Sequence, residues 1–284
     1  MRQSPIKASL IRAALLGALV IPAGACNAQA DQGTSEPAAA ADSSSALAAA
    51  LAAPTRTPAN VARDRYRHPA ETLAFFGVDP GDTVVELWPG GGWYTEVLAP
   101  YLAASGKLYV VPSLGRSAET IAKKIASAPV YSQVTVAPLD PGKQPSPVPA
   151  GSADAVLTFR NVHNWLGSEN NTPIADAVFA EAFRVLKPGG TLGVVEHRLP
   201  EDADAAREKQ SGYVKASTVK ALAEKAGFRF VEASEINANP KDTHDHPGGV
   251  WALPPTYTNK DADRAKYEAI GESDRMTLKF VKPE

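Results

Sequence analysis

The stretch VVELWPGGGWYTE, residues 84–96, decides how the rest of the chain is interpreted. An apolar run ends at Glu86, three glycines follow at residues 90–92, and a segment with helical character comes next. A glycine-rich turn between a strand and a helix lets a ligand approach the backbone closely and directs helix N–H groups toward it. Glu86, at the strand end, is placed to accept hydrogen bonds from an amine or a hydroxyl group. The alternative is a tight turn packed beneath another element, because short glycine motifs also arise by chance.

Strand and helix patterns alternate on both sides of this turn. We expect strands at residues 82–88, 106–112, 132–140, 153–159, 191–197, 228–236 and 276–282. We expect helices at residues 93–103, 117–127, 172–185 and 217–227. The strand at 191–197 is almost continuously apolar, as is usual where helices cover both faces of a parallel sheet. The pattern predicts an α/β, Rossmann-like, doubly wound seven-stranded sheet with its ligand crevice at the carboxyl ends of the strands.

Several segments together resemble the class I S-adenosylmethionine (SAM)-dependent methyltransferases in order and spacing. They are the glycine turn, Leu139-Asp140 at the end of the third strand, GSADAVLTFRNVHNW at 151–165 and AFRVLKPGGTLGVVEH at 182–197. More narrowly, ELWPGGGWYTE at 86–96 and GESDRMTLKF at 271–280 resemble a family of exported predicted methyltransferases. The resemblance covers about residues 60–284.

The resemblance implies that the last strand runs antiparallel and that SAM lies over the glycine turn. The cofactor-binding residues that it implies are Glu86, Gly90, Gly91, Gly92 and Asp140, the last matching the acid that binds the adenine amine. Trp88 stands where the family has its first glycine. The second strand ends in Pro-Ser-Leu at 112–114, without the acid that usually holds the ribose hydroxyls. Losing that charged acceptor is expected to weaken ribose binding by about 1.5–3 kcal/mol.

Histidines follow two of the expected strands. Methyl transfer is an in-line displacement, which needs alignment of the reactants and, for many nucleophiles, a base. His163, in the stretch RNVHNW, is the favoured base, and Asn164 is placed to orient a substrate. His197 and Arg198 follow the fifth strand and point toward the same crevice. We therefore take His163, Asn164 and His197 as the catalytic candidates, although His163 could instead cap a loop and Arg198 could pair with a surface acid.

A long polar stretch, residues 237–274, separates the last two strands. Loops of this length are usually functional or loosely ordered. It contains the sequence DTHDH at 242–246. Three interpretations of this stretch stay open: a lid over the ligand pocket, a solvated loop, or a metal site completed by His163 and His197. No metal ligand is assigned.

The first 30 residues have the pattern of an export signal, with Arg2 and Lys7 ahead of an apolar stretch at 11–25. Two processing routes remain open. Cleavage after Ala30 follows a small-x-small pattern, whereas AGAC at 23–26 resembles a lipobox in which Cys26, the only cysteine, would carry a lipid. We expect a signal peptide at 1–30, a low-complexity linker at 31–58 that serves as a tether, and a methyltransferase-like domain at 59–284. The protein would then be exported, and either periplasmic or membrane-tethered through Cys26.

The functional expectation is a SAM-dependent methyltransferase that acts on a small molecule. The formal charge of −2 offers no basic field, which disfavours nucleic acid as a partner. Two alternatives stay open. One is an exported ligand-binding protein that keeps the fold without transfer activity, and the other is a metal-assisted hydrolase that uses the histidines.

Overall fold

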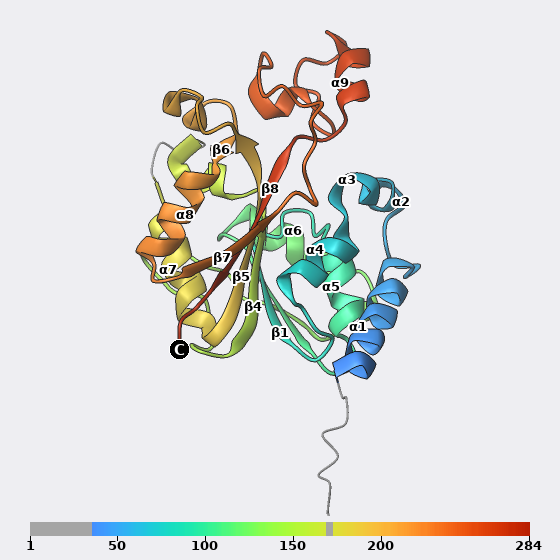
Figure 1. Ribbon diagram of the computed structural model, residues 1–284. Helices are drawn as coiled ribbons and strands as arrows, with labels where there is room; N and C mark the ends of the chain where they lie inside the picture. The colour runs from blue at the N-terminus through green and yellow to red at the C-terminus, as the bar shows by residue number, and fades with distance from the viewer. Residues whose placement is uncertain (1–35, 169–172) are drawn as a thin grey trace, which may run out of the picture.

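A mostly parallel β-sheet forms the centre of the molecule (Figure 1). The computed structural model describes residues 36–168 and 173–284. In these residues the strand order is β3-β2-β1-β4-β5-β8-β7, and the short β6 pairs with β5. The strands are β1 (Thr83–Leu87), β2 (Lys107–Val111), β3 (Val134–Val136), β4 (Ala153–Phe159), β5 (Leu186–Leu199), β6 (Val214–Lys215), β7 (Arg229–Ser234) and β8 (Arg275–Val281).

The predicted α/β architecture is confirmed. Strand β8 runs antiparallel to both of its neighbours, β5 and β7, while the pairings among β1 to β5 are parallel. The two-residue β6 is an addition to the seven strands expected from the sequence. Strand β3 is shorter than the predicted 132–140 because it lies at the sheet edge, where it has only β2 as a partner.

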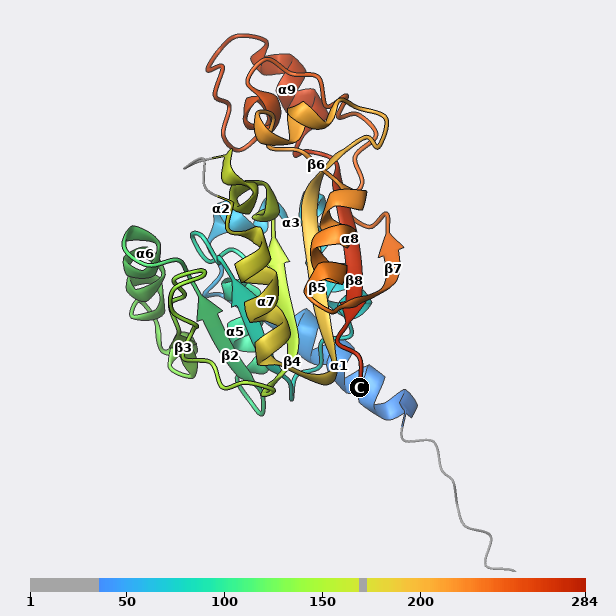
Figure 2. The same cartoon turned by 90° about the vertical axis from the view of Figure 1, so that its left-hand side faces the viewer.

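Helices cover both faces of the sheet (Figures 1 and 2). The α-helices of the described residues are α1 (Glu36–Leu51), α2 (Pro58–Val61), α3 (Asp64–Arg67), α4 (Pro69–Phe76), α5 (Thr95–Leu102), α6 (Arg116–Ile125), α7 (Ala175–Val185), α8 (Ala216–Lys225) and α9 (Arg264–Ile270), the last of which lies above the sheet. Helices α7 and α8 pack on one face, and α1, α4 and α5 pack on the other. Each face buries its own apolar cluster, so every central strand contributes side chains to two cores.

The start of the domain differs from the expectation. The segment 31–58 was predicted to be a linker, but from Glu36 it forms helix α1. Leu47 and Ala50 are buried against the cluster under α4 and α5, and the Ser43 hydroxyl donates to Asp79. The tether prediction is therefore wrong for this part, because the few apolar side chains of an alanine-rich helix fall on one face and cover the core.

The predicted signal peptide, including Cys26, lies outside the described residues, so the processing routes stay predictions. Among the described residues, no helix has the length and the apolar character needed to cross a membrane.

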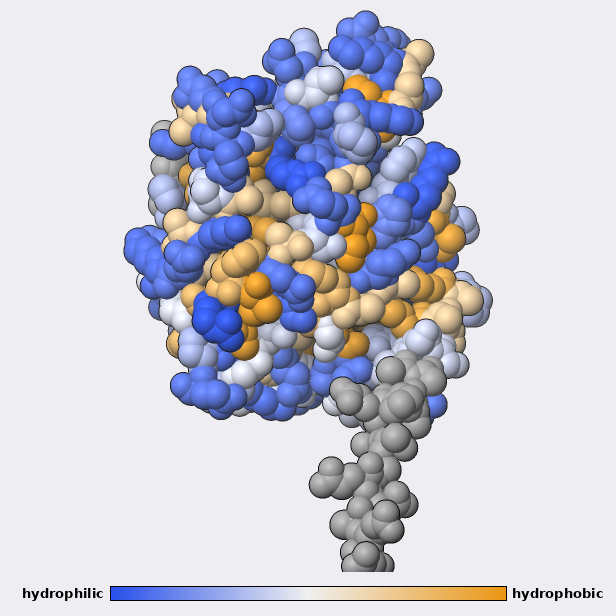
Figure 3. Space-filling view, in the orientation of Figure 1, coloured by the Kyte–Doolittle hydropathy of each residue, from blue (hydrophilic) through white to orange (hydrophobic). Residues whose placement is uncertain are grey.

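The stretch between β7 and β8, residues 237–274, is called the insert below. It stands above the carboxyl ends of the strands, at the top of Figures 1 and 2. Its surface in the space-filling view is mostly hydrophilic (Figure 3). Inside it, Asp242 accepts hydrogen bonds from the Tyr213 hydroxyl at 2.9 Å and from His246 Nε2 at 2.9 Å. These buried contacts hold the insert in place over the sheet.

Candidate active site

The glycine turn forms the floor of a cavity. Gly90 has a φ of 57° and Gly92 a φ of 78°, a left-handed conformation that glycine adopts without strain. A Cβ atom at Gly90 or Gly91 would meet nothing within 4 Å, so these two residues face open space. Gly92 has another reason to be glycine, since a Cβ there would lie 2.5 Å from Lys124 Cδ. The lack of a side chain therefore leaves space in a cavity at Gly90 and Gly91, and it allows close packing against helix α6 at Gly92.

This cavity, the glycine-turn cavity, has a volume of about 220 Å³. It is lined by Asn60, Arg63, Arg67, Glu86, Trp88, Pro89, Gly90, Gly91, Trp93, Tyr94, Phe159, Arg160 and Asn161. The two tryptophans form walls and leave the space open. Trp88 turns toward Trp165, with the ring centroids 5.4 Å apart, and Trp93 Nε1 donates to the Asn60 carbonyl at 3.0 Å.

Glu86 brings a buried carboxyl group to this cavity. It is 2 % exposed, and Thr95 donates a hydrogen bond to it at 2.6 Å. Burial raises the pKa of Glu86 to about 7, even though the Thr95 hydrogen bond and the charges of Arg160 and Lys124 oppose the shift. The group is therefore ready to lose its proton when a cation binds beside it.

Binding of the demethylated cofactor, S-adenosylhomocysteine (SAH), should depend on pH through Glu86. If the carboxylate holds the ligand's ammonium group, protons compete with binding below the pKa of about 7. We expect SAH affinity to be about tenfold weaker at pH 6 than at pH 8. Isothermal titration at both values measures the difference, and Glu86→Gln should make the affinity nearly independent of pH. An unchanged pH dependence in that variant would assign the titration to another group.

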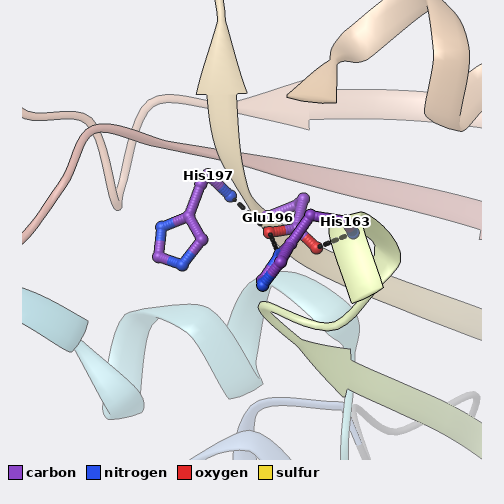
Figure 4. Close-up of side chains that lie close together, drawn as sticks. All are labelled: His163, Glu196 and His197. Carbon is purple, nitrogen blue, oxygen red and sulfur yellow. Dashed lines mark hydrogen bonds and ion pairs between the residues drawn. The ribbon is translucent and has the colours of Figure 1, made fainter. Parts of the chain in front are cut away.

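A second site lies where β4 and β5 end (Figure 4). His163 Nδ1 faces Glu196 Oε1 at 2.9 Å, and Glu196 is fully buried. The same carboxyl group accepts the backbone N–H of Val162 at 2.5 Å and of His197 at 2.8 Å. A carboxylate on Nδ1 favours the tautomer in which the proton is on Nδ1 and the lone pair is on Nε2. That is the arrangement of an oriented general base.

His197 lies beside this pair but in a different state. The His163 and His197 rings are 5.3 Å apart, and His197 Nδ1 is 2.6 Å from the Ser273 hydroxyl. Burial first, and then the positive charges nearby, lower the pKa of His197 well below its usual value. His197 is thus a neutral imidazole at pH 7.

Both histidines line a second cavity of about 260 Å³, called the histidine cavity. The insert supplies its other side through Val250, Trp251, Pro254, Pro255, Thr256, Glu272 and Ser273. The lid interpretation of the insert is therefore supported by its contribution to the cavity wall. Three arginines, Arg63, Arg67 and Arg160, line both this cavity and the glycine-turn cavity, so the two adjoin.

Three residues predicted for the site do not line these two cavities, and the predicted roles of Asp140 and Asn164 stay predictions. Asp140 is in a turn beyond β3, pairs with Lys143 at 3.7 Å and lines neither cavity. Asn164 also lines neither cavity. Arg198 is held by Asp274, at 2.8 Å from both Nε and Nη2, and so has a structural role.

The metal hypothesis takes a different form from the one expected. The insert histidines bind acids, with His244 Nε2 3.2 Å from Asp274 and His246 bound to Asp242. Within the described residues, the group whose ligand atoms lie close enough for a metal is His163, Glu196 and His197, all within 4.8 Å. Because the Glu196 oxygens already accept hydrogen bonds from N–H groups, this geometry favours a hydrogen-bonded base over a metal centre.

Sequence reasoning missed four functional residues. Arg160 directly follows β4, and Glu196 lies near the end of β5, next to His197, so the strand-end rule that found His163 and His197 could have found them as well. Arg63 and Arg67 are four residues apart around helix α3, and no spacing rule links them to the strand ends. Tyr66, between them, lines neither cavity.

Comparison with known proteins shows what this chain is similar to. A family model described as "Methyltransferase domain" matches residues 85–194, from the glycine-turn strand through β5. A crystal structure of a SAM-dependent methyltransferase from Aquifex aeolicus has the same fold, with a TM-score of 0.51 and 21% identity over 64% of this chain and 89% of that one. Residues 85–194 therefore match a methyltransferase domain, and the fold is that of the SAM-dependent methyltransferase structure.

Two curated methyltransferases are similar over shorter stretches. The sterol 24-C-methyltransferase of Schizosaccharomyces pombe is 30% identical over 100 residues, which are 30% of this chain and 25% of that protein. The arsenite methyltransferase of Halobacterium salinarum is 28% identical over 181 residues, which are 60% of this chain and 41% of that protein. The chain thus spans less than half the length of these relatives.

The residues of the methyltransferase domain fit the methionine end of SAM. Glu86 is a buried carboxyl suited to the ammonium group, and the open turn at Gly90 and Gly91 leaves room for the chain that joins it to the sulfur. The strand end at residues 112–114 has no acid for the ribose hydroxyls.

Proposed function

We propose that the protein transfers a methyl group from SAM to a small-molecule acceptor. The observation that carries this proposal is the pair of adjoining cavities, one on the glycine turn and one at the His163–Glu196 pair, with three arginines common to both. A transferase needs this arrangement, because donor and acceptor must meet in line across a short distance.

The residues of the two cavities have different roles in this reaction. Bound SAM supplies the electrophilic methyl group. Glu86 and the turn at Gly90–Gly91 hold the cofactor's methionine end, while Glu196 orients the ring of His163. His163 Nε2 takes the proton from the acceptor as its nucleophile attacks. Trp251 and the two prolines Pro254 and Pro255 wall off water on the insert side.

The size of the histidine cavity favours a small acceptor. About 260 Å³, enclosed by the insert, holds a compact molecule or one group of a larger one. The relatives named for sterol and arsenite methylation show that the fold accepts different acceptors, so they do not choose one for this chain.

Isothermal titration of the purified protein with SAH tests the cofactor site, with Gly91→Leu as the diagnostic variant. A leucine at Gly91 points into open space of the cavity, at a position without positive φ, so it should weaken SAH binding at least about tenfold without disturbing the fold. Gly81→Ala is the matched control, since its Cβ would meet only Ser105 Oγ at 3.9 Å.

The outcomes separate the proposal from its alternatives. Absence of heat with SAH at millimolar concentration would remove the enzyme proposal. SAH binding without transfer of tritium from methyl-labelled SAM to any small molecule of a cell extract would favour a ligand-binding protein that keeps the fold.

A further inference from the structure

The three arginines shared by the cavities carry more positive charge than the protein neutralises. Glu272 contacts two of them, at 2.5 Å from Arg63 Nε and 3.0 Å from Arg67 Nε. It also pairs with Arg275 at 2.9 Å. Burial alone would raise the pKa of Glu272, but these arginines and Arg160 lower it to about 2. Three arginines thus pair with one carboxylate, and the charge of a fourth, Arg160, also acts on it.

Two of these guanidinium groups have unused hydrogen-bonding capacity. Arg67 is 2 % exposed, and its Nη1 has no hydrogen-bond partner. A buried, unpaired cationic donor is costly, so such groups are normally satisfied. The Arg160 side chain, in the part of the chain that the structure describes, forms no hydrogen bond or ion pair and faces both cavities.

The backbone at Arg160 shows that its position is imposed by the fold. Its φ is 62°, in the left-handed region that non-glycine residues rarely adopt, and its N–H is held by the Val195 carbonyl at 2.7 Å. Unfavourable conformations of this kind concentrate at functional sites. Burial and the Arg275 charge lower the pKa of Arg160 to about 10. The charged form of Arg160 is therefore destabilised by its surroundings in the protein without a ligand.

SAM alone does not relieve this excess of charge. Its one carboxylate is accompanied by a sulfonium and an ammonium group, so the bound cofactor adds a net positive charge. Even with Glu86 ionised, the two cavities therefore remain positive after SAM binds. A second, anionic molecule is needed to balance the site.

We propose that the methyl acceptor carries an oxyanion, a carboxylate or a phosphate, that Arg67 and Arg160 bind at the junction of the two cavities. This inference rests on the proposed function. The planar guanidinium groups offer paired N–H donors that match the oxygens of such a group. Bound there, the oxyanion would hold the rest of the acceptor in the histidine cavity beside His163.

Inorganic phosphate is the probe, titrated calorimetrically into the protein in low-chloride buffer, with and without saturating SAH. We expect phosphate to bind in both cases, and not to displace SAH. Arg160→Gln should weaken phosphate binding about tenfold or more and leave SAH affinity within about threefold. Arg63→Gln is a second variant in case Arg160→Gln does not fold, and Arg65→Gln, an exposed arginine of the same helix as Arg67, is the control that should change nothing.

The possible results separate this inference from the proposed function. If phosphate competes with SAH, or if the arginine variants lose SAH instead, the arginines serve the cofactor's carboxylate and the inference is overturned. Absence of phosphate binding to the wild type also overturns it. If SAH does not bind but phosphate binds and requires Arg160, the methyltransferase proposal fails while the oxyanion site stands.

Discussion

Replacing His163 with Gln is expected to lower kcat by about 10²–10⁴-fold, the usual contribution of a positioned general base. His163 lines the histidine cavity but not the glycine-turn cavity, so SAH affinity should change by less than about threefold. The rate of tritium transfer from methyl-labelled SAM to the small-molecule fraction of an extract measures the first quantity. Isothermal titration with SAH measures the second.

His197→Gln is the matched comparison, because His197 lines the same cavity and lies 5.3 Å from His163, ring to ring. Its Nδ1 is engaged with Ser273, and its lowered pKa makes it a weak base. We expect it to lose less than about tenfold in rate. Equal losses in the two variants, or a collapse of SAH affinity in His163→Gln, would refute the base assignment.

Glu196→Ala is expected to have the largest effect on stability among the site residues. The carboxyl group is fully buried and accepts hydrogen bonds from the backbone N–H groups of Val162, His163 and His197 and from His163 Nδ1. Its removal leaves four donors without this acceptor, so the free energy of unfolding should fall by about 3–5 kcal/mol. For a domain of this size the melting temperature should drop by about 10 °C.

Urea unfolding followed by circular dichroism measures this change. Glu196→Gln keeps one acceptor oxygen and should lose clearly less, whereas Glu119→Ala, on the exposed side of α6, should stay within about 0.5 kcal/mol of wild type. A Glu196→Ala protein as stable as wild type would mean that water replaces the carboxylate and that Glu196 does not hold His163.

Few of the residues that line the two cavities could be predicted from a linear sequence motif. The glycine-turn strand and the two histidines follow the rule that ligands bind at the carboxyl ends of parallel strands. Asp140 follows the same rule in sequence. After β3 ends at Val136 the chain stays beside β2 as far as the bridge between Ser113 and Leu139, so Asp140 lies at this edge of the sheet, where it pairs with Lys143 and lines neither cavity. The strand-end rule thus predicts the edge of the sheet but not the cavity that a side chain lines.

The sequence by itself determined the α/β architecture, the antiparallel last strand through its family resemblance, the glycine turn with Glu86, and the two histidines near the ends of β4 and β5. These features depend on local periodicity and on residues that follow one another directly, which a sequence displays. The tertiary structure alone decided the pairing of His163 with Glu196, 33 residues away, and of Arg63 and Arg67 with Glu272, more than 200 residues away. It also decided that α1 packs on the core. Such contacts depend on how distant segments pack together and on which buried charges find a partner. The spacing of residues along the chain shows neither the packing nor the pairing.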